Sequence, residues 1–150
     1  MDLEIIKELY EQGLICFHES FDTWQEAVLA SIEPMIEHGN VSKEYGEGII
    51  KSAEENGLYI FLAPHICMPH CGLYEYVKKP CFCFMKVNQP VIADPDDPEM
   101  GAELFFAIAA TQAGEHLDFI SKLSTLLGDD EVVNTLLSVR NEEDLKKILY

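Results

Sequence analysis

The chain has 150 residues, of which 27 are Asp or Glu and only 10 are Lys or Arg, so its net charge is −17. This acidity argues against a nucleic-acid partner, because phosphate backbones are bound by Lys and Arg. Apolar residues make up 48% of the chain but form no stretch as long as a membrane span, so we expect one globular domain over residues 1–150 without membrane insertion. Five cysteines, an odd number, and a start without a basic secretory signal predict reduced thiols and a cytoplasmic protein.

The first half of the chain predicts three helices and two short strands. Asp22 and Gln25 resemble a capping box, Pro34 is expected to kink the helix that follows them, and Ser42 is expected to cap the next helix. Residues 63–71 hold two histidines, two cysteines and two prolines and are expected to form a stiff loop. In chain order the expected elements are a helix over 3–11, a strand over 14–17, a helix over 22–39, a helix over 42–56 and a strand over 59–62.

The second half predicts two further strands and three helices. Residues 81–87 form an apolar run with one lysine, typical of a strand buried on both faces, whereas prolines and acidic side chains predict a surface loop over residues 88–100. The remaining elements are a strand over 104–110 and helices over 115–127, over 129–137 and from 141 onward. This alternation predicts an α/β fold in which a mixed β-sheet is flanked by helices on both faces, a three-layer α/β/α sandwich.

Two histidines are candidate reactive groups. His70 lies in the stiff loop, where a neutral imidazole can accept a phosphoryl group on one ring nitrogen while a hydrogen bond holds the other. The spacing alone, however, favours an ordinary hydrogen-bonded loop histidine. His116 lies in the first turn of a predicted helix, where the helix dipole favours a neutral imidazole and a nearby anion. The sequence leaves open whether His116 is instead an exposed residue without a ligand.

Other polar groups in the chain have simpler interpretations. His65, Cys67, His70 and Cys71 are possible metal ligands, but their spacing fits no usual zinc pattern, so no metal is expected. Cys81 and Cys83 lie two residues apart on a predicted strand and are expected to be small buried side chains. The lysines expected to be solvated are Lys78, Lys79 and Lys86.

The order of motifs along the chain is similar to that of a known family. Its most specific pair is Met68-Pro69-His70 with the later His116 at a helix start. The other matching motifs are Trp24-Gln25-Glu26-Ala27, Gly39-x-Val41, the helix over 45–50, Gly57-Leu58-Tyr59-Ile60, Ala63-Pro64, Ala109-Ala110 and Glu115-His116-Leu117. From about residue 14 to 149 the chain resembles the IIA component of bacterial phosphoenolpyruvate-dependent sugar phosphotransferase systems, in the fructose–mannitol superfamily. The Tyr59-Ile60-x-x-Ala63-Pro64 sequence is most similar to the ascorbate-type branch.

The resemblance implies a mixed α/β sandwich that works without a bound organic cofactor. In that family the histidine of the Met-Pro-His motif accepts a phosphoryl group from the phosphocarrier protein HPr and passes it to a cysteine of a IIB component during carbohydrate uptake. The matching acceptor is His70, and the second family histidine, which helps to hold the phosphoryl group, matches His116. Loop amides near Cys71 and Gly72 are expected to contribute further hydrogen bonds to the phosphate.

Two departures from the family pattern bear on this function. Cys71-Gly72 stands where family members usually have Ala-Arg, which removes a cation beside the phosphate. His65 stands where family members often have glycine, and its imidazole is expected to replace part of the lost charge. An alternative function is a diverged regulatory binding module of the same fold with little or no phosphotransfer, and a second alternative is a metal- or redox-responsive protein that uses the loop cysteines.

Overall fold

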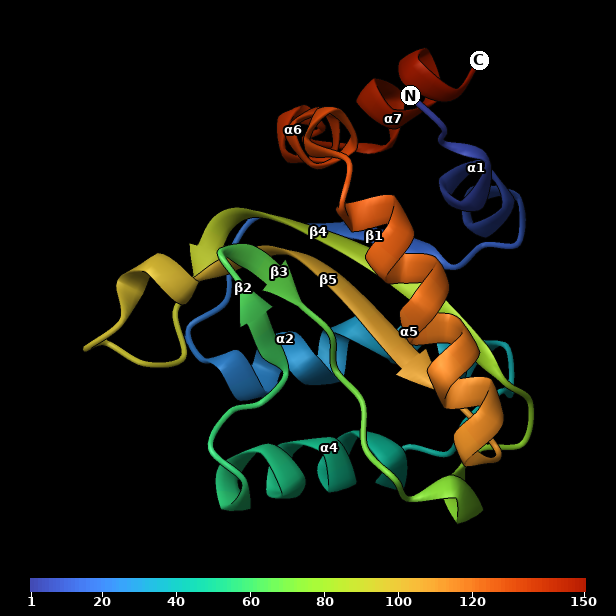
Figure 1. Cartoon of the computed structure of the whole chain (residues 1–150), viewed down its shortest axis with the longest axis vertical. Helices are drawn as coiled ribbons and strands as arrows, with labels where there is room; N and C mark the ends of the chain where they lie inside the picture. The colour runs from blue at the N-terminus through green and yellow to red at the C-terminus, as the bar shows by residue number, and fades with distance from the viewer.

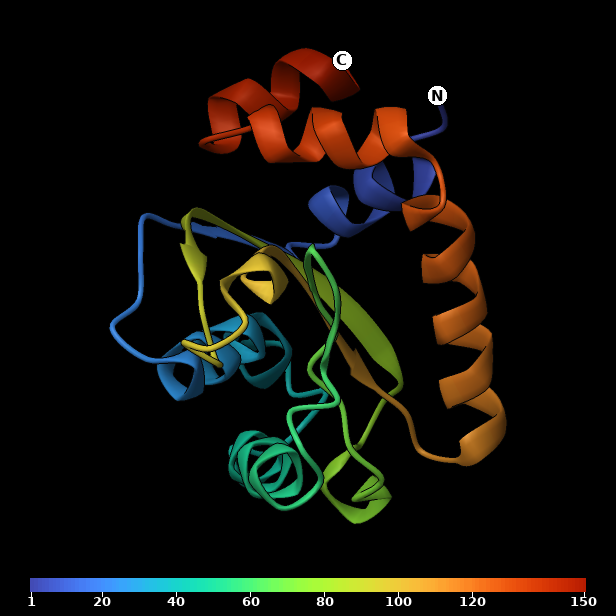
Figure 2. The ribbon, with the colours of Figure 1, turned by 60° about the vertical axis from the view of Figure 1, so that its left-hand side comes forward.

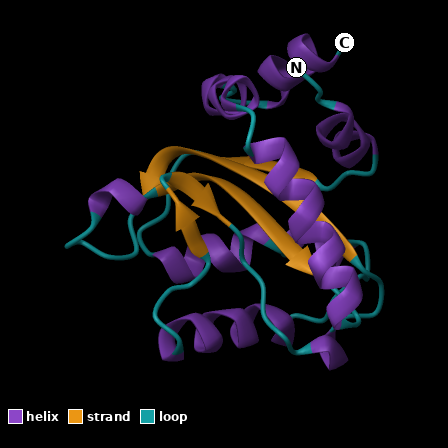
Figure 3. Ribbon diagram, viewed as in Figure 1, coloured by secondary structure: helices purple, strands orange, loops and turns teal.

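The computed structural model describes residues 1–150 and contains a five-stranded mixed sheet with helices on both faces (Figures 1 and 3). The strands are β1 (Ile15–His18), β2 (Phe61–Ala63), β3 (His65–Cys67), β4 (Cys81–Val91) and β5 (Ala102–Ala109). The helices are α1 (Glu4–Glu11), α2 (Trp24–Ser31), α3 (Glu33–Glu37), α4 (Glu44–Glu55), α5 (Ala113–Leu127), α6 (Asp130–Ser138) and α7 (Glu142–Leu149), with 3-10 turns η1 (Tyr74–Tyr76) and η2 (Pro98–Met100). The predicted three-layer arrangement is confirmed.

The strand order, β1-β4-β5-β3-β2, places β5 next to both β4 and β3. β4 and β5 are antiparallel, as are β2 and β3, whereas β1 runs parallel to β4 and β3 runs parallel to β5. Because β3 and β5 are parallel neighbours, their carboxyl ends lie at the same edge of the sheet. The segments that follow these two strands are therefore brought together, and they carry His70 and His116.

The interior strand β4 is covered on both faces, as the apolar run predicted. Cys83 Sγ donates a hydrogen bond to Ser31 O at the end of α2, whereas Lys86 Nζ donates to Val139 O just after α6. Since side chains alternate along a strand, odd-numbered residues of β4 face α2 and even-numbered residues face α6. Figure 2 shows the same division, with α2 and α4 on one face of the sheet and α5 on the other.

Lys86 contradicts the prediction of a solvated side chain. It is 2% exposed, and its ammonium group donates to Asn88 Oδ1 at 3.2 Å and to Val139 O at 2.8 Å. The physical reason is its even-numbered position on β4, which directs it under α6. Burial lowers the pKa of its amine.

The histidine-rich segment is a hairpin followed by a short loop. The strand expected over 59–62 begins at Phe61 in the structure, and residues 65–67, expected to be loop, form β3. Pro64 occupies the turn between β2 and β3, and His65 follows it with a φ of 75°, which allows the chain to reverse tightly. The prediction was wrong here because it treated Pro64 as part of one stiff loop instead of as a turn between two strands.

The expectation of a surface loop over 88–100 was also wrong in its first part. β4 continues to Val91, which pairs with Ala102, and the register of β4 against β5 shifts between Lys86 and Val91. Gln89 N meanwhile donates to Glu19 O at 2.9 Å, so the strand keeps a partner on its other edge. Pro90 is tolerated at this irregular, exposed end of the strand.

Helix boundaries differ from the expected ones by a few residues. Thr23, not Asp22, caps α2 by accepting a hydrogen bond from Glu26 N, and the expected kinked helix is two helices, α2 and α3. Ser42 gives no side-chain cap to α4, and its hydroxyl is buried without a partner. The end of the molecule that holds both chain termini is formed by α1, α6 and α7 (Figure 1). None of the helices has the length and apolar character needed to span a bilayer.

Candidate functional site

His70 lies just beyond the carboxyl end of β3, in a segment that the sheet holds on both sides. Met68 N donates to Ile60 O at 2.8 Å, and Ile108 N on β5 donates to Pro69 O at 2.9 Å. These bonds extend the strand pattern to the residue before His70. The His70 side chain is half-buried, so its ring is both supported and accessible.

The two ring nitrogens of His70 have different environments. Nδ1 lies 2.5 Å from Met68 O. Because a carbonyl oxygen can only accept a hydrogen bond, Nδ1 carries the proton, and in the neutral ring Nε2 then holds the free lone pair. The backbone thus fixes the tautomer in which Nε2 has the free lone pair.

His116 is the fourth residue of α5, and its ring lies beside that of His70. The ring centroids are 4.9 Å apart with an interplanar angle of 56°. Its Nδ1 is buried and makes no hydrogen bond. The sheet topology therefore brings together two imidazoles that are 46 positions apart in the sequence, as the two sequence predictions required.

The start of α5 adds hydrogen-bond donors to the same place. Its N-cap residue, Gln112, makes no side-chain cap, so the first-turn amides of this helix have no side-chain acceptor from that position. The carboxylate of Glu115 instead accepts from Thr111 N at 2.8 Å and from the Thr111 hydroxyl, and these bonds lower its pKa. A helix of 15 residues with open first-turn amides favours a bound anion.

Both imidazoles are held in the neutral form. Burial lowers the pKa of His70, the Met68 carbonyl opposes this shift, and the neighbouring His116 adds to it. Burial also lowers the pKa of His116. At neutral pH the pair therefore presents one free lone pair on His70 and a second imidazole that can supply a hydrogen bond.

Cys71 and Gly72 follow His70 and lie between it and α4. The Cys71 thiol is buried, and this burial raises its pKa, so it is a poor nucleophile. Gly72 is exposed, with no atom within 4 Å of the place where a Cβ would stand. Together they border an open groove of about 450 Å³ whose lining residues are Gly48, Lys51, Ser52, Glu55, Cys71, Gly72 and Leu73.

His65 is not close to His70. It pairs with Ala102 at the start of β5, whereas Pro69, next to His70, bonds to Ile108 near the end of that strand. Six residues of extended β5 separate the two places, a span of roughly 20 Å. The His65 ring is half exposed and contacts the carboxylate of Glu103 at 3.0 Å.

The loop cysteines and histidines do not converge on one point either. No group of three or more His, Cys, Asp or Glu side chains in the chain is arranged to hold a metal ion. Cys67 is fully buried, and its pKa is raised by that burial, while His65 lies at the far end of β3. The structure thus gives no support to a metal- or redox-responsive loop.

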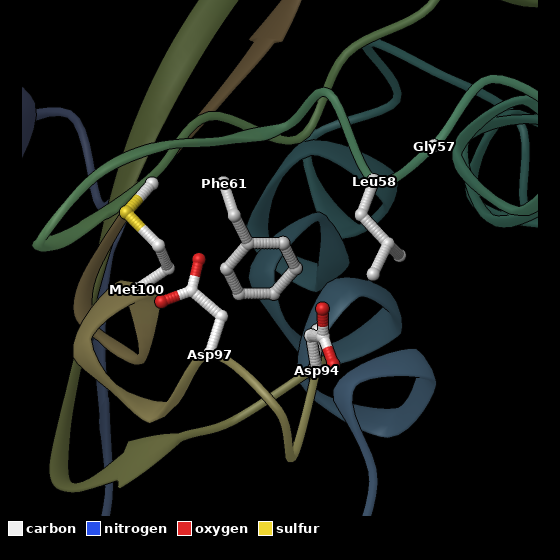
Figure 4. A pocket seen from close by; sticks show the side chains of 7 residues that line it. Gly57, Leu58, Phe61, Asp94, Asp97 and Met100 are labelled. Carbon is white, nitrogen blue, oxygen red and sulfur yellow. The ribbon is translucent and has the colours of Figure 1, made fainter.

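A small pocket of about 150 Å³ has neither imidazole in its lining (Figure 4). Leu58 and Phe61 form its apolar wall, and Asp94 and Asp97 extend from the opposite loop toward Phe61. With two carboxylates and no imidazole or amine in its lining, this pocket repels an anion. Because neither His70 nor His116 lines this pocket, it is separate from their site.

An imidazole with a free lone pair, a second imidazole and the N-terminus of α5 meet at one edge of an α/β sandwich, an arrangement that suits an anion such as a phosphoryl group. The family model described as "Phosphoenolpyruvate-dependent sugar phosphotransferase system, EIIA 2" matches residues 8–150. The chain belongs to this family of sugar phosphotransferase components.

Proteins similar to this chain include components of ascorbate-specific and mannitol-specific phosphotransferase systems. The ascorbate-specific EIIA component of Mycoplasma pneumoniae is 28% identical over 142 residues, which cover 94% of this chain and 88% of the relative. The mannitol-specific cryptic enzyme IIA component of Escherichia coli K12 is 29% identical over 139 residues, 93% of this chain and 92% of the relative. A solved IIA structure from Streptococcus mutans, 28% identical, superposes with a TM-score of 0.81 over 96% of this chain and 91% of that one.

Proposed function

We propose that this protein is a phosphoryl carrier of a carbohydrate uptake system, in which His70 accepts a phosphoryl group from phosphorylated HPr and passes it to a cysteine of a IIB component in the cytoplasm. The observation that carries the proposal is the hydrogen bond from His70 Nδ1 to Met68 O beside the ring of His116. It leaves Nε2 as a free nucleophile next to a second imidazole. The relatives include ascorbate- and mannitol-specific proteins at similar identity, so we propose a carbohydrate without naming one.

In the first step the lone pair of His70 Nε2 attacks the phosphorus of the donor phosphohistidine. The new N–P bond forms as the old one breaks, and the bonding electron pair returns to the donor imidazole. Positive charge develops on the His70 ring, and the Met68 carbonyl stabilises it through Nδ1–H. In the second step a IIB thiolate attacks the same phosphorus, and the electron pair returns to Nε2.

His116 would hold the transferred group. Its ring is close enough to His70 for one phosphoryl group to contact both, and a dianion at this position raises the affinity of the second ring for a proton. The open amides of the first turn of α5 would add further donors. The single arginine, Arg140, is not available for this task, because it lies beside Glu19 at 3.6 Å.

Mass spectrometry after incubation with phosphoenolpyruvate, enzyme I and HPr tests this function. We expect the wild-type chain to gain one phosphoryl group and to lose it to a IIB component, and His70→Ala to gain none. His65→Ala is the matched control and keeps the full mass gain, since its ring lies at the other end of β3. Tight binding of HPr or IIB without any mass gain would instead favour the regulatory module.

A further inference from the structure

Tyr59 makes two contacts with His70. Its hydroxyl donates a hydrogen bond to the backbone carbonyl of His70. Its ring lies against the His70 imidazole, with centroids 5.1 Å apart and an interplanar angle of 78°. One tyrosine thus contacts both the backbone and the side chain of the reactive residue.

A second hydroxyl completes a chain of hydrogen bonds from α4. Tyr59 Oη lies 3.2 Å from Ser52 Oγ. The single hydroxyl proton of Tyr59 points to His70 O, so Ser52 is the donor in this pair. Burial raises the pKa of Tyr59, while the hydrogen bond with Ser52 lowers it. The chain of bonds therefore runs from Ser52 through Tyr59 to His70.

The hydrogen bonds from Ser52 through Tyr59 hold the His70 carbonyl, which no backbone hydrogen bond holds. Met68 and Pro69 are each tied to the sheet by a backbone hydrogen bond, to Ile60 and to Ile108. The His70 carbonyl is instead held by a side chain, and exposed Gly72 follows two residues later. Without the Tyr59 hydroxyl, the His70 carbonyl has no hydrogen-bond donor.

We propose that Tyr59 is a positioning residue for phosphoryl transfer at His70, and this inference rests on the function proposed above. Its hydroxyl fixes the peptide plane after His70, and its ring limits the rotation of the imidazole. In-line transfer depends on the aim of Nε2 at phosphorus, and displacements of about 1 Å cost large factors in rate. Both contacts of Tyr59 with the site are with His70 itself, so it acts through His70.

Tyr59→Phe tests the inference, because it removes the hydroxyl and keeps the ring. In single-turnover transfer from phosphorylated HPr, we expect the rate at saturating donor to fall about tenfold, with the donor concentration for half-maximal rate unchanged. Ser52→Ala, which removes the outer bond to Tyr59 together with a 3.4 Å contact from Asn56 Nδ2, is expected to slow transfer about threefold. Tyr10→Phe is the matched control, since its hydroxyl contacts Glu142 at the end of the molecule that holds the termini, and it should transfer at the wild-type rate.

The ring resonances of His70 in ¹H–¹⁵N spectra separate positioning from general stability. We expect the Nδ1–H signal to broaden and shift in Tyr59→Phe and to remain unchanged in Tyr10→Phe. A Tyr59→Phe variant with the wild-type spectrum of His70, or with a transfer rate within twofold of wild type, overturns the inference. Failure of the wild-type chain to become phosphorylated defeats the proposed function instead, and the spectrum then still decides whether Tyr59 holds His70. If Tyr59→Phe fails to fold, Ser52→Ala is judged by the same two measurements.

Discussion

His65 and His70 lie five residues apart in one motif but have opposite environments. His65 stands at the start of β3, half exposed, with its Nδ1 against the Glu103 carboxylate. His70 stands beyond the other end of that strand, half-buried, with its Nδ1 on a backbone carbonyl and a second imidazole 4.9 Å away. A carboxylate beside an imidazole repels a phosphoryl group, whereas a neutral carbonyl that fixes the tautomer prepares the ring to receive one.

The end of the strand at which a histidine lies, not the residue type, determines what that histidine can do here. The carboxyl ends of parallel β3 and β5 meet at the start of α5, where open amides favour an anion. The other end of the sheet carries Glu103 and buried Lys86 beneath α6, groups that serve stability. The predictions below test this division between the two ends.

After loss of His70 itself, replacement of His116 should have the largest effect on transfer of the phosphoryl group. His116→Ala removes the second imidazole and leaves the His70–Met68 bond intact, so we expect the single-turnover rate to fall about 100-fold, the usual cost of losing one donor to a developing anion. Quench-flow transfer from phosphorylated HPr measures this rate. His116→Gln keeps a hydrogen-bond donor and should recover part of the lost rate. A wild-type rate in His116→Ala would show that the second imidazole does not contribute to transfer.

Replacement of Lys86 should weaken the opposite end of the sheet without affecting the histidines. Lys86→Ala leaves Val139 O and Asn88 Oδ1 without their donor, so we expect the free energy of unfolding to fall by about 2 kcal/mol. Urea denaturation measures the loss, and Lys86→Met, which keeps most of the packing, should cost less. Phosphorylation of His70 in the folded variant should match wild type, and a slower rate would show that the two ends are coupled.

The pH dependence of transfer follows from the neutral state of His70. Its pKa lies below the usual value of about 6.5, mainly because of burial, so the rate should be constant above that pH and fall about tenfold per pH unit below the lowered pKa. The free energy of unfolding depends on the same proton, because the unfolded chain binds it more readily than the folded one. The contribution of His70 to this free energy is therefore complete above about pH 6.5 and is lost as the pH falls through the lower pKa of the folded state.

An NMR titration of the His70 ring measures that pKa directly. His116→Ala is the informative variant, since loss of a neighbouring imidazole should move the His70 pKa upward. A midpoint at or above 6.5 in the wild-type chain would contradict the burial described here.

The smallest effect is expected at His65. Its φ of 75° lies in the left-handed region that favours glycine, so His65→Gly relieves about 1 kcal/mol of backbone strain while it loses a half-exposed contact with Glu103. We expect the free energy of unfolding to change by less than about 1 kcal/mol and the transfer rate not to change. Thermal unfolding and the phosphorylation assay measure the two quantities, and slower phosphorylation would give His65 a role that its position does not suggest.

Much of this fold could be predicted from the sequence, because hydrophobic pattern and helix caps are local. The helix expected from residue 141 onward is α7, which Asn141 caps by accepting from Asp144 N, and the apolar run at 81–87 is buried on both faces. The hairpin of β2 and β3 was missed because Pro64 signals a loop and a turn equally well. The buried Lys86 was missed because a lysine within an apolar strand gives no sign of which layer covers it.

The site was predicted in part. His70 and His116 were selected from their places after a strand and at a helix start, and parallel β3 and β5 bring them together. His65 was expected beside the phosphate only because it is near His70 in sequence. In an extended strand, however, residues five positions apart lie far apart in space, and β3 separates the two histidines. Tyr59 could not be selected, since its bond to the His70 carbonyl depends on how the hairpin folds back.

Spectroscopy can identify which ring nitrogen of His70 carries the phosphoryl group. The hydrogen bond from His70 Nδ1 to Met68 O leaves Nε2 as the nitrogen with a free lone pair. We therefore expect ³¹P- and ¹⁵N-detected spectra of the phosphorylated chain to show a single N–P bond, at Nε2 of His70. A phosphoryl group on Nδ1 of His70, or on His65, would contradict the account, because neither nitrogen is free at the edge of the sheet where β3 and β5 end.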